Sequence, residues 1–139
     1  MLHSTQELTA LLAQVKTIAV VGAVDKPGRP VDRIGRYLMG AGFTVIPVHP
    51  KRKDVWGLPT YPSLLDIPEP VDLVNLFRRA EFCPDHAREA LRMRPLPKAV
   101  WMQSGIVSDE ARYILKDAPI VVVEDRCVMV DHQRMAGAK

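Results

Sequence analysis

Basic side chains gather in one short segment, His49-Pro50-Lys51-Arg52-Lys53, with no acidic residue before Asp54. The segment follows an apolar stretch, residues 43–48, that has the composition of a buried strand. At the end of the second strand of a nucleotide-binding sheet, an NAD site places an acidic residue that binds the ribose hydroxyls. Three consecutive cations would instead attract a ribose that carries an extra phosphate. Two common ligands have such a group, NADP and coenzyme A (CoA). The composition alone also fits a solvated basic loop, and the position after the second strand favours the ligand site.

A second candidate segment is VVGAVDKPGRP, residues 20–30, where an apolar run stops at Gly22. Turns between a strand and a helix commonly bind phosphate on backbone N–H groups. Gly22 and Ala23 would allow the backbone to approach a diphosphate, and Lys26 and Arg29 would add positive charge. The G-x-G-x-x-G fingerprint of dinucleotide sites is absent, so an ordinary strand–helix connection stays an open interpretation.

Two further segments follow apolar stretches, Arg78-Arg79 and Gln103-Ser104-Gly105-Ile106. The arginines could reach the same ligand, or be solvated and paired with nearby acidic residues. Gly105 would let the backbone approach a ligand, although an ordinary loop before a capped helix explains this segment equally well. Trp56 and Trp101 are interpreted as packing residues.

The elements that must position these segments alternate in type along the chain. Apolar runs predict strands at 17–21, 43–48, 71–77, 98–102 and 119–123. Helical spacing and capping residues predict helices after Ser4, at 31–39, 83–93 and 108–115, and after residue 126. This alternation predicts the α/β class, as one Rossmann-like domain spanning 1–139 with a mostly parallel five-stranded sheet and helices on both faces. In such sheets ligands bind outside the carboxyl ends of the strands, where all the candidate segments fall.

Composition excludes several other classes of protein. Of the 139 residues, 47% are apolar and 25% charged, and the net charge of +3 is too modest, without a basic helix face, to indicate nucleic-acid binding. No signal peptide and no membrane span is recognisable, so we expect a cytoplasmic protein. Cys83 and Cys127 are isolated and lack metal-ligand spacing, so we expect free thiols and no metal site. No combination of residues indicates a catalytic site.

Taken in order, several segments resemble one family: IAVVGAVDKPGRP, GFTVIPVHPK, GLPTYPSLLDIPEPVDLVNLFRR, KAVWMQSGI and EDRC. This is the family of stand-alone CoA-binding proteins. Its single domain is similar to the N-terminal CoA-binding domain of the succinyl-CoA synthetase α subunit and of ADP-forming acyl-CoA synthetases. The resemblance covers about residues 14 to 132.

The resemblance implies coenzyme A as the cofactor and assigns parts of the ligand to particular residues. The diphosphate would bind at Gly22, Ala23, Val24, Lys26 and Pro27, and the phosphorylated adenosine at His49, Pro50 and Lys51. Phe77, Arg78 and Arg79 would line the site, with Gln103 to Ile106 near the pantetheine. Two positions depart from the family pattern. Val24 stands where a hydroxyl residue is common, and His49 where Asn is common, so affinity for CoA or its pH dependence could differ.

We therefore expect a protein that binds CoA or an acyl-CoA without catalysis of its own, and that binds neither nucleic acid nor a membrane. One alternative is an NADP-linked redox enzyme or redox-sensing regulator. Another is the CoA-binding subunit of an acyl-CoA synthetase whose ligase and ATP-grasp domains are separate chains. A homodimer or a synthetase partner chain is the protein–protein contact that the resemblance implies.

Overall fold

The computed structural model of the protein describes residues 3–137, in which strands and helices alternate. The strands are β1 (Thr17–Val21), β2 (Thr44–Val48), β3 (Leu73–Leu76), β4 (Ala99–Met102) and β5 (Val121–Val123). The α-helices are α1 (Thr5–Leu12), α2 (Pro30–Gly40), α3 (Cys83–Arg92), α4 (Asp109–Leu115) and α5 (Val128–Gly137). Every strand and helix expected from the sequence is present, with ends shifted by only a residue or two.

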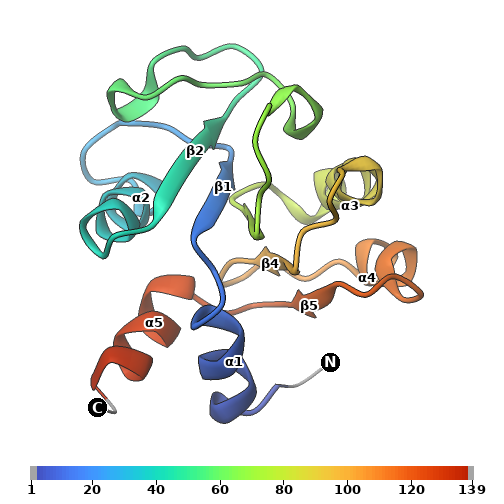
Figure 1. Cartoon of the computed structure of the whole chain (residues 1–139). Helices are drawn as coiled ribbons and strands as arrows, with labels where there is room; N and C mark the ends of the chain where they lie inside the picture. The colour runs from blue at the N-terminus through green and yellow to red at the C-terminus, as the bar shows by residue number, and fades with distance from the viewer. Residues whose placement is uncertain (1–2, 138–139) are drawn as a thin grey trace.

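The five strands form one parallel sheet in the order β2-β1-β3-β4-β5. Helices α1, α2 and α5 lie on one face and α3 and α4 on the other (Figure 1). The predicted fold class is thus confirmed, and the sheet is parallel throughout. Its register aligns the strand ends, because Val21 pairs with Val48 on one side and with Leu76 on the other.

Each face of the sheet carries its own apolar core, as expected when a parallel sheet is covered on both sides. Side chains of β1 alternate between the two cores, and Ile18, Ala19 and Val20 are fully buried. Trp101 on β4 is also fully buried, which confirms its interpretation as a packing residue. Asn75 is the one polar residue of the otherwise apolar strand β3. Its side-chain amide is buried, and neither of the two polar atoms has a hydrogen-bond partner among the described residues.

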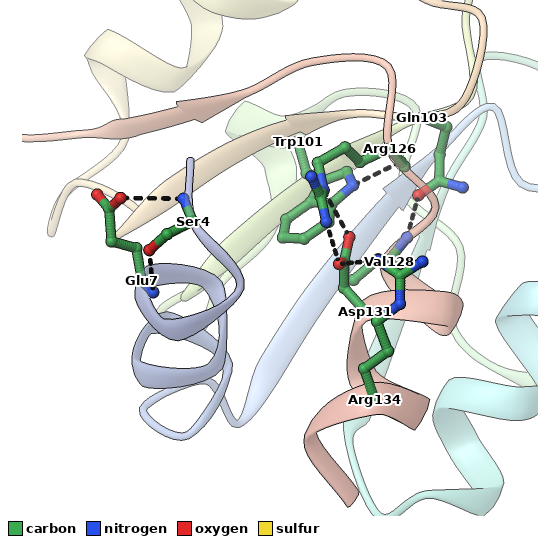
Figure 2. A network of polar contacts seen from close by, with 8 residues as sticks. All are labelled: Ser4, Glu7, Trp101, Gln103, Arg126, Val128, Asp131 and Arg134. Carbon is green, nitrogen blue, oxygen red and sulfur yellow. Dashed lines mark hydrogen bonds and ion pairs between the residues drawn. The ribbon is translucent and has the colours of Figure 1, made fainter. Parts of the chain in front are cut away.

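Local sequence signals fix where several helices begin. Ser4 and Glu7 form a capping box at the start of α1 (Figure 2). Ser108 caps α4 by accepting a hydrogen bond from the Ala111 N–H at 3.1 Å. Pro30 and Pro84 occupy the first turns of α2 and α3, where the missing proline N–H removes no hydrogen bond within the helix.

The order of the strands defines one special place in the sheet. The chain passes from β1 to its neighbour β2 and then returns to pair β3 on the other side of β1. In open α/β sheets of this order, ligands bind at the carboxyl ends of the two strands that flank this switch point. Within residues 3–137, no helix is long and apolar enough to cross a bilayer.

Candidate functional site

Three of the predicted segments meet at the switch point between β1 and β3. The Gly22 N–H donates to the carbonyl oxygen of Val48, at 2.9 Å, which joins the first turn to the end of β2. On the other side, a Cβ atom added to Gly22 would lie 2.4 Å from the Phe77 carbonyl oxygen. Gly22 also has a φ of +85°, so the sequence needs glycine here both for space and for conformation. We call residues 22–29, 49–53 and 77–79 the switch-point site.

The backbone N–H groups of the first turn divide into two sets. Those of Gly22 and Ala23 both donate to the Val48 carbonyl, so they are already paired. Those of Val24, Asp25 and Lys26 have no hydrogen-bond acceptor among residues 3–137 and remain available to a ligand. Helix α2 follows, and its N-cap residue Arg29 makes no side-chain cap. The turn therefore has free N–H groups a few residues before a helix N-terminus, and both features attract anions.

His49 organises the basic segment after β2. Its Nδ1 accepts hydrogen bonds from the backbone N–H groups of Lys51, at 3.1 Å, and Arg52, at 3.0 Å. Burial lowers the pKa of His49 below its ordinary value of 6.5, and the charges of Arg52, Arg78 and Lys51 lower it further. The neutral ring therefore carries its proton on Nε2. The ends of β2 and β3 flank the end of β1, because Val21 pairs with both Val48 and Leu76.

The two predicted arginines after β3 differ in environment. Arg78 is half-buried: its Cδ lies 3.4 Å from where a Gly22 Cβ would be, and its guanidinium stacks on the Phe82 ring, 4.3 Å from the centroid. Its buried Nε atom has no partner among the described residues. By contrast, Arg79 leaves 84% of its side chain exposed and forms an ion pair with Glu81 at 3.9 Å. Arg78 thus belongs to the site, whereas Arg79 lies at its solvent-exposed margin.

Most cations of the switch-point site form no ion pair within the described residues. Within residues 3–137, six cations contributed by the three segments have no carboxylate at ion-pair distance: Lys26, Arg29, Lys51, Arg52, Lys53 and Arg78. Cations without ion-pair partners raise the local positive potential and attract polyanions. Pro27 and Pro50 are exposed beside these cations.

The fourth predicted segment, Gln103 to Ile106, lies next to the site but is largely occupied by protein contacts. The Gln103 Oε1 atom accepts from the Val128 N–H at 3.0 Å, which caps α5 (Figure 2). The Gly105 N–H donates to Asp125 Oδ1 at 2.6 Å, and the Ile106 N–H donates to the Gln103 carbonyl at 2.9 Å. Ser104 is exposed. Figure 2 also shows Arg126 paired with Asp131 beneath this corner.

The apolar groove at the other end of the strands is unsuited to a polyphosphate. This groove of about 740 Å³ lies at the amino ends of β1 and β2, lined in part by Leu12, Phe43 and Met135. The switch point lies at the other end of the strands, at their carboxyl ends. In the described part of the chain, no group of three His, Cys, Asp or Glu residues could hold a metal ion.

Sequence reasoning missed two contributors to this region. Phe82 follows the arginine pair and stacks against Arg78, but an exposed aromatic residue gives no signal by itself. Trp56, expected only to pack, bonds through its backbone N–H to Asp25 of the first turn, at 3.3 Å. One signal for Trp56 was present in the sequence. Gly35 stands inside a helix, where glycine is unfavourable, and in the structure the Trp56 ring packs against it.

The chain is similar to a known family, to a bacterial protein and to a solved structure. Residues 16–133 match the model of the family described as CoA binding domain. The chain is 36% identical over 129 residues to the uncharacterized protein YneT of Bacillus subtilis, covering 93% of this chain and 94% of YneT. It superposes on a solved structure from Thermus thermophilus (cell-free ID.343) with a TM-score of 0.88 and 45% identity, covering 96% and 99% of the two chains.

A match to a much longer protein covers only a part of it. The chain is 38% identical over 90 residues to ADP-forming acetate–CoA ligase I of Archaeoglobus fulgidus. The match covers 65% of this chain and 13% of the ligase.

Proposed function

Because the chain belongs to the CoA-binding domain family, we propose that it binds coenzyme A or an acyl-CoA at the switch-point site, without catalysis of its own. The observation that carries the proposal is that six cations of the site form no ion pair within residues 3–137, while the N–H groups of Val24, Asp25 and Lys26 in the first turn are free. CoA carries a diphosphate and a 3′-phosphate, and both need such groups. Binding by N–H groups and cations requires no reacting side chain.

Each segment of the site has a part of the ligand to bind. The diphosphate would accept hydrogen bonds from the Val24, Asp25 and Lys26 N–H groups, supported by the guanidinium of Arg78. The phosphorylated adenosine would lie against His49, Pro50 and Lys51, with Arg52 beside them. Phe77 and the Gln103–Ile106 segment would border the pantetheine. Val24 lacks a hydroxyl, but its N–H is among those left free, which supports phosphate binding through the backbone alone.

Thermal unfolding with CoA, dephospho-CoA, NADP and NAD at equal concentrations tests this proposal. A ligand at a hundred times its dissociation constant adds about 2.7 kcal/mol, which raises the midpoint by roughly 5 to 15 °C for a domain of this size. We expect this shift with CoA and a much smaller one with dephospho-CoA. A response to NADP without a response to CoA would support the redox alternative instead. No response to CoA would overturn the proposal.

Two neighbouring arginines provide a matched pair of variants. We expect Arg78→Ala to weaken CoA binding by roughly ten-fold or more, the value of a charge-assisted hydrogen bond. Arg79→Ala should change it by no more than about two-fold, because Arg79 is exposed and paired with Glu81. Calorimetric titration of both variants measures the difference. Equal losses in the two variants would show that Arg78 has no special role.

The similarity to part of an acetate–CoA ligase favours one second candidate, a CoA-binding subunit that serves a separate ligase chain. Co-purification of the tagged chain with an ATP-hydrolysing partner, strengthened by CoA, would support this function. A chain that binds CoA and recovers no such partner would favour a stand-alone binding protein.

A further inference from the structure

Trp56 adopts a backbone conformation that is unusual for a bulky residue. Its φ of 55° and ψ of 24° lie in the left-handed region, and Asp54, two residues before it, is also left-handed with a φ of 54°. Large L residues rarely adopt this conformation, and they keep it only where surrounding contacts enforce it. The contacts that enforce it therefore indicate what this loop is built to do.

Three contacts hold Trp56 in place, and all are made to residues of the β1–α2 segment. The indole Nε1–H donates to Asp32 Oδ1 at 2.9 Å, and the backbone N–H donates to Asp25 Oδ2 at 3.3 Å. The ring lies directly over Gly35 in the middle of α2. A Cβ atom added to Gly35 would come within 2.2 Å of the ring, closer than real atoms approach.

The loop that contains Trp56 is closed at its base. The His49 N–H donates to the Tyr61 carbonyl at 2.9 Å, and the Tyr61 N–H donates to the Pro47 carbonyl at 3.1 Å. Loop 49–61 is thus held at two places, at its base beside β2 and at Trp56 over α2. The cations Lys51, Arg52 and Lys53 lie between these two anchors and make no ion pair within the described residues.

We propose that Trp56 is a positioning residue that fixes loop 49–61 over α2 and thereby sets the preference of the site for CoA over dephospho-CoA. This inference rests on the proposed function. The cations of the loop sit on a short, exposed segment, and the attraction between charges falls with their separation. A loop released from α2 would spread these cations and lose the 3′-phosphate, while the diphosphate contacts at the first turn would persist.

Two glycines of α2 offer a matched test that leaves the loop sequence untouched. Gly35→Ala should displace the ring, although alanine favours the helix. Gly40→Ala changes the same helix where a Cβ atom would meet nothing within 4 Å. Trp56→Ala removes the anchor itself. Calorimetric titration of each variant with CoA and with dephospho-CoA gives the ratio of the two affinities, and thermal unfolding without ligand verifies that each variant is folded.

We expect the wild-type chain to prefer CoA by about ten-fold or more, the equivalent of one charge-assisted hydrogen bond. In Gly35→Ala and Trp56→Ala this preference should fall below about three-fold, mainly through weaker binding of CoA, while Gly40→Ala keeps it. General destabilisation would weaken both ligands alike and leave the ratio unchanged. Folded variants that retain the wild-type ratio overturn the inference alone. Equal wild-type affinity for CoA and dephospho-CoA also overturns it, whereas a wild-type chain that binds no CoA overturns the proposed function as well.

Discussion

At the scale of single residues, His49 combines a structural contact with a titratable ring. Its neutral Nδ1 accepts two backbone hydrogen bonds, and both burial and nearby cations hold its pKa below the ordinary 6.5. As the pH falls through 6.5, His49 becomes protonated in the unfolded chain while it is still neutral in the folded chain. The unfolded state then binds more protons, so the free energy of unfolding decreases in this window.

The variant His49→Asn isolates this effect, because an asparagine side-chain oxygen can accept the same two N–H groups without titrating. We expect wild-type stability to fall relative to the variant as the pH decreases from 6.5, with a slope of at most one proton, about 1.4 kcal/mol per pH unit. Above pH 7 the difference should be constant. Urea unfolding of both proteins between pH 5 and 8 measures it, and parallel curves throughout would contradict the assigned pKa direction.

At the scale of elements, the contact between the end of β1 and the end of β3 leaves no room for a side chain. We expect Gly22→Ala to lower the free energy of unfolding by at least about 2 kcal/mol, since it combines a left-handed φ with a steric clash against the Phe77 carbonyl. Gly28→Ala is the control, because Gly28 has a φ of +90° with nothing within 4 Å of an added Cβ. Denaturant unfolding should show that Gly28→Ala lowers the free energy of unfolding by only about 1 kcal/mol. Equal losses would show that the β1–β3 contact can relax.

Elements whose structure is set by neighbouring residues in the sequence could be predicted, whereas those that depend on distant contacts could not. Strand β1 is a continuous apolar run, and α4 begins at the serine that caps it, so both could be placed without tertiary information. The pairing of the Gly22 and Ala23 N–H groups could not, because it depends on where β2 ends relative to β1. The path of loop 49–61 was equally inaccessible. Its left-handed Trp56 is held by Asp25, Asp32 and Gly35, which lie more than twenty positions away in the sequence.

For the site, residue types placed the cations correctly at the strand ends, whereas their individual roles needed the structure. Arg78 and Arg79 are indistinguishable in sequence, yet one is half-buried and the other exposed. The same applies to Gln103, whose oxygen caps a helix that lies twenty-five residues further along the chain.

At the scale of the whole molecule, the reactivity of the two free cysteines can report unfolding. Burial raises the pKa of Cys83 to about 11 from 9.0, while Cys127 is only partly buried. This rise in pKa alone leaves roughly 100-fold less thiolate on Cys83 near pH 8 than on a thiol with the ordinary pKa. With a thiol reagent we expect one thiol to react fast and the second only as the molecule unfolds. Cys127→Ser should remove the fast phase, and a fast phase that persists in this variant would contradict the assignment.

The closure of loop 49–61 also has a consequence for self-association of the protein at high concentration. Strand β2 is an edge of the sheet, and an edge strand with free backbone groups is a template on which other chains can pair and aggregate. Tyr61 returns to bridge Val48 and occupies the outer side of β2, and Pro47 removes one donor from that strand. At the opposite edge, a ring nitrogen of His3 bonds the Val122 carbonyl of β5 at 2.7 Å. The chain thus obstructs both margins of its own sheet, so the segment that carries the cations also hinders strand-to-strand self-association.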